Sequence, residues 1–222
     1  MSQELWTAVE EYLTETLVRP DAALNAALAE SASAGLPNIA VSPCMGKWLH
    51  LLARIRGAQS ILEIGTLGGY STIWLARALP PGGRLITLES EPTHAEVAHR
   101  NLSRAGVADR VEIRLGPALA TLPQLSGPFD FIFIDADKSA IPDYFRHALR
   151  LSRPGAVIIV DNVVRNGAVV DAASADESVQ GVRRFHEMVA SEPRVSATAL
   201  ATTNSKGYDG FTLVLVQDSA LP

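Results

Sequence analysis

The chain has 222 residues, of which 47% are hydrophobic and 19% are charged. This composition excludes a chain that stays disordered, and the length is sufficient for one well-buried core. The formal net charge of -5 at pH 7 gives no footprint for sequence-independent phosphate binding, which argues against a nucleic-acid partner. We expect one domain over residues 1–222, with a helical cap at 1–56 and an α/β core at 57–222.

The cysteine content and the apolar runs bear on the cellular compartment. Cys44 is the only cysteine, so no intrachain disulfide can form, and a buried structural thiol in a reducing compartment is the natural interpretation. The first residues lack the basic start and apolar stretch of a secretory signal, and no apolar run approaches the roughly 20 residues of a membrane-spanning helix. We expect a cytoplasmic protein without membrane contact.

Three helices are predicted before residue 57. The first is amphipathic, with apolar residues at helical spacing and glutamates on the other side. The apolar positions are Trp6, Val9, Leu13 and Leu17, and the glutamates are Glu10, Glu11 and Glu15. An alanine-rich helix follows over about residues 22–34. The third covers about residues 43–56 and starts with a proline, whose missing N–H does no harm in a first turn.

From residue 60, short aliphatic runs alternate with longer helical patterns. The strand candidates are residues 61–64, 84–88, 111–115, 129–134 and 156–160. The helices between them cover about residues 71–79, 93–105, 118–122 and 140–151. Strands that alternate with helices favour right-handed crossovers and a mostly parallel sheet covered on both faces. The predicted fold class is therefore a doubly wound α/β domain.

The C-terminal part follows a different pattern. A loop of small and polar residues extends to residue 176, and a helix is predicted over about residues 179–190. Two closing strands, about residues 195–201 and 211–216, are joined across residues 204–210, whose turn-forming side chains suit a hairpin.

The loop after the first strand combines an acid, glycines and a hydroxyl. Residues 63–71 read Glu-Ile-Gly-Thr-Leu-Gly-Gly-Tyr-Ser. Ligands of α/β sheets collect near the first strand, and glycines let a ligand approach the backbone. A dinucleotide fingerprint that starts at Gly65 needs glycines where Leu67 and Tyr70 stand, so a nicotinamide cofactor is disfavoured. Taken alone, the loop is almost equally well explained as a tight strand-to-helix turn.

Two later strand ends indicate an adenosine. Glu89 ends the second strand, where an acid can accept hydrogen bonds from both ribose hydroxyls. Gly116, Pro117 and Ala118 follow the third strand and would line the adenine, although they also suit a helix start with proline in its first turn. Because the glycines for a pyrophosphate are missing, S-adenosylmethionine (SAM) fits better than NAD, FAD or ATP.

Oxygen donors end the fourth and fifth strands. Asp135 follows the fourth strand, and Asp161 and Asn162 end the fifth. A set without histidine or thiolate is typical of Mg²⁺, with Mn²⁺ or Ca²⁺ as alternatives. Each part also has a structural explanation, since Asp135 could cap the next helix and Asp161-Asn162 could form an ordinary turn. Their joint occurrence beside the SAM loop favours a cation that chelates two adjacent substrate oxygens.

Lys138 is the candidate base. A divalent cation and a sulfonium nearby favour its neutral amine, which can take the proton of an acceptor hydroxyl. The oxyanion then attacks the SAM methyl in line, without a covalent enzyme intermediate. The structural alternative is a solvated residue at a helix start, paired with Asp137. The five histidines show no ligand spacing and are not expected to bind metal.

Four motifs together carry a resemblance to a known family. They are residues 63–71, residues 116–119, residues 135–138, and Asp161-Asn162 followed by Asn166-Gly167. From about residue 35 to residue 216 the chain resembles the cation-dependent O-methyltransferases, the group of the plant caffeoyl-CoA O-methyltransferases and their bacterial relatives, with catechol O-methyltransferase more distant. The resemblance implies a Rossmann-like SAM methyltransferase fold, a seven-stranded sheet with an antiparallel last strand, and a homodimer.

The resemblance also implies roles for single residues. Asp135, Asp161 and Asn162 would bind the metal, and Lys138 would be the base, acting beside Asp135. The SAM contacts would be Val41, Glu63, Gly65, Thr66, Ser71, Glu89, Pro117, Ala118 and Asp135.

The predicted function is cation-dependent methyl transfer from SAM to a hydroxyl of a small catechol-like or phenolic acceptor. Plant members usually carry an aromatic residue shortly after the Asp-Asn pair, where this chain has Val163-Val164-Arg165, which disfavours a CoA-ester substrate. Arg165 could meet an acidic or polar acceptor, or it could be a solvated loop residue. We expect residues 168–176 and the N-terminal helix to shape the acceptor pocket.

Two rival hypotheses remain open. Some bacterial relatives methylate a hydroxylated uridine in transfer RNA, and the acidic net charge counts only weakly against this. A SAM-binding domain that regulates without turnover is the other rival. The intact set of Asp135, Lys138, Asp161 and Asn162 argues against it, because a silent binder has no need of these residues.

Overall fold

The computed structural model describes residues 2–218. Seven strands form one sheet in the order β3-β2-β1-β4-β5-β7-β6. Strands β1 to β5 pair in parallel, and β7 is antiparallel to both β5 and β6. The strands are β1 (Ser60–Ile64), β2 (Arg84–Glu89), β3 (Val111–Leu115), β4 (Phe129–Ile134), β5 (Ser152–Asp161), β6 (Val195–Asn204) and β7 (Gly207–Val216). The predicted Rossmann-like sheet with an antiparallel last strand is thereby confirmed.

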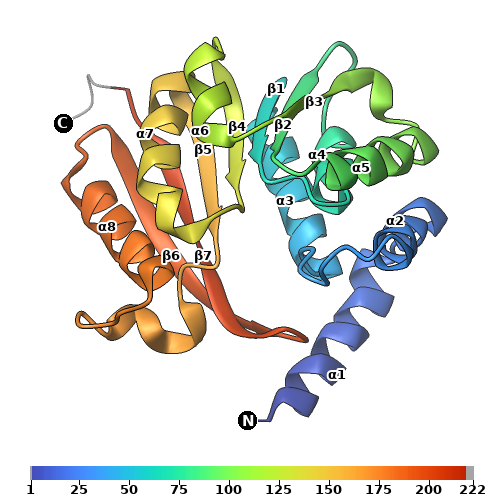
Figure 1. The fold of residues 1–222 in the computed structure, drawn as a ribbon, viewed down its shortest axis with the longest axis horizontal. Helices are drawn as coiled ribbons and strands as arrows, with labels where there is room; N and C mark the ends of the chain where they lie inside the picture. The colour runs from blue at the N-terminus through green and yellow to red at the C-terminus, as the bar shows by residue number, and fades with distance from the viewer. Residues whose placement is uncertain (1, 219–222) are drawn as a thin grey trace.

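Helices cover both faces of this sheet, with α7 and α8 on one side and α3, α4 and α5 on the other (Figure 1). The α-helices are α1 (Gln3–Leu13), α2 (Ala22–Ser33), α3 (Pro43–Arg56), α4 (Tyr70–Ala76), α5 (Pro92–Arg104), α6 (Ala118–Thr121), α7 (Ile141–Leu151) and α8 (Glu177–Ser191). A π-helical stretch, Thr14–Val18, continues α1, and short 3₁₀ segments are Ala108–Arg110, Leu122–Gln124, Lys138–Ala140 and Arg165–Val170. None of the helices within residues 2–218 combines the length and the apolar character needed to cross a membrane.

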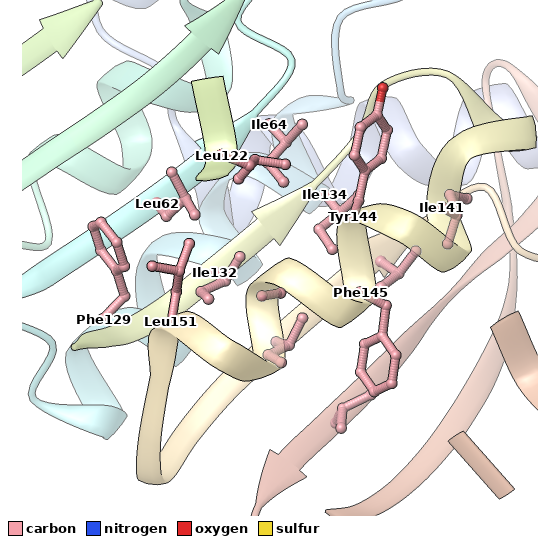
Figure 2. Packing of buried hydrophobic residues seen from close by; sticks show 14 of the residues in the cluster. Leu62, Ile64, Leu122, Phe129, Ile132, Ile134, Ile141, Tyr144, Phe145 and Leu151 are labelled. Carbon is pink, nitrogen blue, oxygen red and sulfur yellow. The ribbon is translucent and has the colours of Figure 1, made fainter. Parts of the chain in front are cut away.

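Two apolar layers hold the sheet because successive side chains of a strand point to opposite faces. On β1, Leu62 packs into the layer beneath α7 and α8, whereas Ile61 packs into the layer beneath α3 and α4. Figure 2 shows the first layer, in which Leu62 and Ile132 lie beside Leu151 of α7, while the hydroxyl of Tyr144 points away from the cluster. Each fully buried large apolar side chain contributes roughly 1.5–3 kcal/mol. The strand ends are therefore held firmly relative to one another.

The N-terminal helix has a different orientation from the predicted one. Glu10, expected on the polar side, is only 7% exposed, whereas Leu17 is 69% exposed. The Oε2 atom of Glu10 accepts hydrogen bonds from the backbone N–H (2.8 Å) and the hydroxyl (2.5 Å) of Ser205. The prediction for Glu10 was wrong because periodicity shows which residues share a face, but not which face meets the rest of the protein.

The β6–β7 hairpin is longer than predicted. Asn204 pairs with Gly207, so the turn consists of Ser205 and Lys206 rather than residues 204–210. The tip extends beyond the other strands toward α1 (Figure 1), and Gln3 Nε2 donates a hydrogen bond of 2.9 Å to the carbonyl oxygen of Asn204. The N-terminal helix and the hairpin tip therefore meet beside the carboxyl edge of the sheet.

A buried carboxyl group links β1, β2 and α4. Glu63 is fully buried, and its oxygens accept hydrogen bonds from the hydroxyls of Ser71 (2.7 Å), Thr72 (2.5 Å) and Thr87 (2.7 Å). Burial raises the pKa of Glu63 from 4.5 to about 7, while the three hydroxyl donors oppose the rise. The group is therefore a pH-sensitive part of the core.

We expect the free energy of unfolding to fall as the pH rises through this window. Between pH 4.5 and about 7 the folded protein keeps the proton of Glu63, whereas the unfolded chain releases it. The resulting loss is complete above the folded pKa and amounts to about 3 kcal/mol. Glutamine cannot titrate, so the Glu63→Gln variant lacks this pH dependence. The difference in the free energy of unfolding between parent and variant, measured by urea unfolding from pH 4 to pH 8, therefore isolates the effect. A stability difference that does not change with pH, or that changes in the opposite direction, would contradict it.

Candidate active site

The strand register brings the predicted site residues to one edge of the sheet. The switch point lies between β1 and β4, because β2 and β3 lie on one side of it and β5 on the other. Ile64 pairs with Ile134, and Ile134 pairs with Val160. Asp135 and Asp161 therefore follow directly paired residues of neighbouring strands, as the metal hypothesis requires.

Two cavities open at this edge. The first has a volume of about 680 Å³, and ten of its lining residues were predicted as site residues: Val41, Gly65, Thr66, Ser71, Glu89, Pro117, Ala118, Asp135, Lys138 and Asn162. The second, of about 380 Å³, is lined by Asp135, Asp161 and Asn162 together with residues of α1, α3 and the β6–β7 hairpin. Asp135 and Asn162 line both, so the two cavities meet at these residues.

Of the predicted SAM contacts, Glu63 lies behind the wall of the first cavity rather than in its lining. Ser71, which donates to Glu63, does line the cavity. Glu63 can therefore act on a ligand through the orientation of this hydroxyl.

Glu89 organises the loop after β1. Its Oε2 accepts hydrogen bonds from the backbone N–H groups of Thr66 (3.2 Å) and Leu67 (2.7 Å), and its Oε1 accepts one from Glu91 (3.0 Å). Each carboxylate oxygen has two lone pairs, so Oε1 can accept a further hydrogen bond from a ligand hydroxyl, whereas Oε2 already accepts two. The sequence predicted the ligand contact but not this internal role.

Gly65 lets the same loop pack against the end of β4. Its φ is +100°, and an added Cβ would lie 2.1 Å from the carbonyl oxygen of Asp135. Only glycine combines this backbone conformation with so close an approach. The loop that lines the first cavity is therefore in direct contact with the first candidate metal ligand.

Asp135, Asp161 and Asn162 form the candidate cation site. Asp161 Oδ1 accepts a hydrogen bond of 2.8 Å from the backbone N–H of Asn162. Burial raises the pKa of Asp161 to about 7, the Asp135 carboxylate adds to the rise, and the Lys138 ammonium opposes it. Two adjacent carboxylates that repel each other in a buried place favour a cation between them.

The donor chemistry fits a hard divalent cation. Within residues 2–218 no group of three or more His, Cys, Asp or Glu side chains is placed to hold a metal ion. The set reaches three protein ligands only through the amide oxygen of Asn162. Two carboxylates and one amide oxygen, with remaining positions for water and substrate, are the donors that Mg²⁺ accepts.

Lys138 lies beside this cluster. Its Nζ donates to Asp135 Oδ1 at 2.6 Å. Gly181 of α8 supports the segment from the other side, since an added Cβ there would lie 2.2 Å from the carbonyl oxygen of Lys138. The alternative of a solvated lysine paired with Asp137 is not what the structure shows.

Asp137, rather than Asp135, caps the segment after β4. Its Oδ1 accepts hydrogen bonds from the backbone N–H and the hydroxyl of Ser139, each 3.0 Å long. The structural explanation considered for Asp135 therefore belongs to its neighbour, and Asp135 is left to face both cavities.

The sequence analysis missed the contribution of the β6–β7 hairpin. Asp209 Oδ1 accepts hydrogen bonds from the backbone N–H groups of Val164 (2.9 Å) and Arg165 (3.0 Å), so it holds the loop that follows the Asp-Asn pair. In the sequence, residues 204–210 were interpreted only as the turn between the two closing strands. No local pattern indicates that Asp209 binds the loop after Asn162.

The lining of the second cavity corrects one prediction and agrees with another. None of residues 168–176 belongs to the lining, so the prediction for this loop was wrong, and hairpin residues take its place. The N-terminal helix does line the cavity, through Val9, Glu10 and Leu13. Arg165 lines the first cavity and not the second.

Several known proteins have sequences and structures similar to those of this chain. A catechol O-methyltransferase from Niastella koreensis is 51% identical over 221 residues, which cover 98% of this chain and 100% of the relative. A crystal structure of an O-methyltransferase from Bacillus cereus in complex with SAH has a TM-score of 0.96 and 57% identity, and covers 97% of this chain and 100% of that one.

The order of similarity differs from the expected one. The caffeoyl-CoA O-methyltransferase 1 from Eucalyptus globulus is 34% identical over 179 residues, which cover 76% of this chain and 71% of the relative. A relative named as a catechol O-methyltransferase is thus more similar than this plant enzyme. The family model described as O-methyltransferase matches residues 15–216. The chain therefore belongs to the O-methyltransferase family.

Proposed function

We propose that the chain transfers a methyl group from SAM to one hydroxyl of a small catechol-like acceptor, with a divalent cation held by Asp135, Asp161 and Asn162. The observation that carries this proposal is the junction of the two cavities at Asp135, where Lys138 Nζ lies 2.6 Å from Oδ1. The name of the Niastella relative and the SAH in the Bacillus structure support the acceptor class and the donor.

The first cavity suits the methyl donor. Glu89 would accept hydrogen bonds from the ribose hydroxyls, residues 116–118 would line the adenine, and the loop around Gly65 allows close approach to the backbone. SAM supplies an electrophilic methyl group on a positively charged sulfur. The carboxylate of Asp135 would lie toward this positive charge.

The second cavity suits a flat aromatic acceptor. Apolar side chains from three separate segments form its walls, among them Ile39, Met45, Trp48 and Phe211. Trp48 and Phe211 pack together with their ring centroids 4.1 Å apart. These walls would exclude water from the reacting hydroxyl and hold the ring with one edge toward Asp135 and Asp161.

Lys138 is placed to move the proton. As a neutral amine it takes the proton of the acceptor hydroxyl, whose oxygen then forms a bond to the methyl carbon while the bond from that carbon to sulfur breaks. The products are the methyl ether, SAH and the ammonium of Lys138, which returns its proton to solvent. A divalent cation would supply the positive charge that polarises two adjacent acceptor oxygens.

The acidic net charge of -5 agrees with a small-molecule acceptor rather than a nucleic acid, and the single cysteine agrees with a cytoplasmic location.

Metal removal tests the proposed cation. We expect EDTA to abolish methylation of catechol, measured by transfer of label from SAM, and Mg²⁺ or Mn²⁺ to restore it. Asp161→Ala should lower kcat/KM on the order of 100-fold or more, since Lewis-acid stabilisation is worth several kcal/mol. The Kd for SAM, measured by calorimetry, should stay close to that of the parent because Asp161 does not line the first cavity.

The matched control is Asp143→Ala, which removes an exposed carboxylate on α7 that pairs with Arg146. This variant should keep the parent activity. Full turnover after exhaustive chelation would refute the cation. Transfer of label to cellular RNA in place of catechols would refute the acceptor class.

We also propose a homodimer that covers the N-terminal helices. Their large apolar side chains are unusually exposed, with Leu17 at 69% and Ile55 at 81%. Exposed apolar patches of this kind mark contact surfaces, and symmetric dimers are the most frequent assemblies.

Light scattering after size exclusion tests the dimer. We expect a mass of twice the 23.7 kDa of one chain, and a shift to one chain in Leu17→Glu or Ile55→Glu, because each places a charge in an apolar contact. Val170→Glu, at a residue that is 85% exposed outside these helices, is the control and should leave the mass unchanged. A parent protein with the mass of one chain at micromolar concentration would exclude the dimer.

A further inference from the structure

Lys206 stands out in the second cavity. It is one of three lysines in the chain and lies in the two-residue turn of the β6–β7 hairpin. Among the described residues that line this cavity it is the only one with a positively charged side chain, whereas four of them are acidic. The acids are Glu10, Asp135, Asp161 and Asp209.

The ammonium of Lys206 has no carboxylate partner of its own. Within residues 2–218 its one hydrogen-bond acceptor is the carbonyl oxygen of Ala40, a neutral group, and it belongs to no ion pair. Burial lowers the pKa of Lys206, and the carboxylates of Asp135, Glu10 and Asp161 partly oppose this. An ammonium has three N–H donors, so two remain for a ligand.

Three of the four acids have other partners. Glu10 accepts two hydrogen bonds from Ser205, and Asp209 accepts a hydrogen bond from a backbone N–H of the loop after Asn162. Asp135 forms an ion pair with Lys138. None of them neutralises Lys206 through a contact. The side chain of Lys206 is exposed, so its ammonium is open to an anionic ligand group in the cavity, and charge-assisted hydrogen bonds of this kind are roughly twice as strong as neutral ones.

We propose that Lys206 selects acceptors in which the catechol ring carries a carboxylate substituent, an assignment that rests on the proposed methylation of catechols. The vicinal hydroxyls would lie toward Asp135, Asp161 and Asn162, and the ring would lie between the apolar walls. The substituent would extend toward the hairpin, where the ammonium receives it. Recognition then depends on charge as well as on the shape of the ring.

Pairs of acceptors that differ only in this charge test the proposal. They are dihydroxyphenyl carboxylic acids with no, one or two carbons between ring and carboxyl, each compared with its primary amide. We expect the best acid to exceed its amide about tenfold in kcat/KM, equivalent to about 1.4 kcal/mol, mainly through a lower KM. Catechol itself is the reference acceptor in every enzyme.

Variants at this position should change the preference in a graded way. Lys206→Met should bring each acid and its amide to similar kcat/KM, and Lys206→Arg should keep the preference for the acid. Lys206→Glu should favour the corresponding amine over the acid. Lys47→Met, which removes a lysine that packs over Trp74 outside both cavities, is the control and should keep the parent values.

Three outcomes overturn the proposal. They are a parent enzyme that treats every acid like its amide, a preference that survives in Lys206→Met, and a preference that is lost in the control Lys47→Met. The first comparison needs only the parent protein, so it decides the matter even if a variant does not fold. Failure to methylate catechol itself would instead refute the proposed function, and the two failures are distinguishable.

Discussion

The parallel register of three neighbouring strands is the constraint on which the rest of the structure depends. Ile64, Ile134 and Val160 lie side by side in β1, β4 and β5, so the residues that follow them leave the sheet at the same edge. Buried apolar layers on both faces prevent these strands from sliding, because a shift by one residue would turn every side chain to the wrong face. The loop after β1, the carboxylates and Lys138 are thereby brought together without any direct bond between most of them.

Charge balance explains why this edge is suited to ligands. Burial and the nearby carboxylate of Asp135 raise the pKa of Asp161, and the ammonium of Lys138 and the backbone N–H of Asn162 oppose this. A cation and a sulfonium donor would both be attracted to such a place. On the other side of Asp135, Lys206 provides positive charge that this cluster does not neutralise through a contact. Each cavity thus combines carboxylates with at least one positively charged side chain, and the two share a wall.

The second cavity is built differently from the first. The first cavity is formed largely by loops at the strand ends, whose conformation follows from local features such as Gly65 and the Glu89 carboxylate. The second cavity adds α1, the start of α3 and the β6–β7 hairpin, which contact one another only in the folded protein. Changes in these outer segments can alter the second cavity while the parallel strands and the proposed cation site stay as they are.

The sequence by itself determined the strands, the helices and the chemically distinctive strand ends. The alternation of short and long apolar patterns can be recognised within short stretches of the sequence. Asp135, Asp161 and Glu89 were identified because acidic residues at strand ends are unusual in an apolar context. The tertiary structure alone decided the burial of Glu10, the position of Glu63 behind the cavity wall, and the presence of the hairpin, rather than residues 168–176, in the lining of the second cavity. These features depend on contacts between segments far apart in the chain, and such contacts leave no period or spacing in a single sequence.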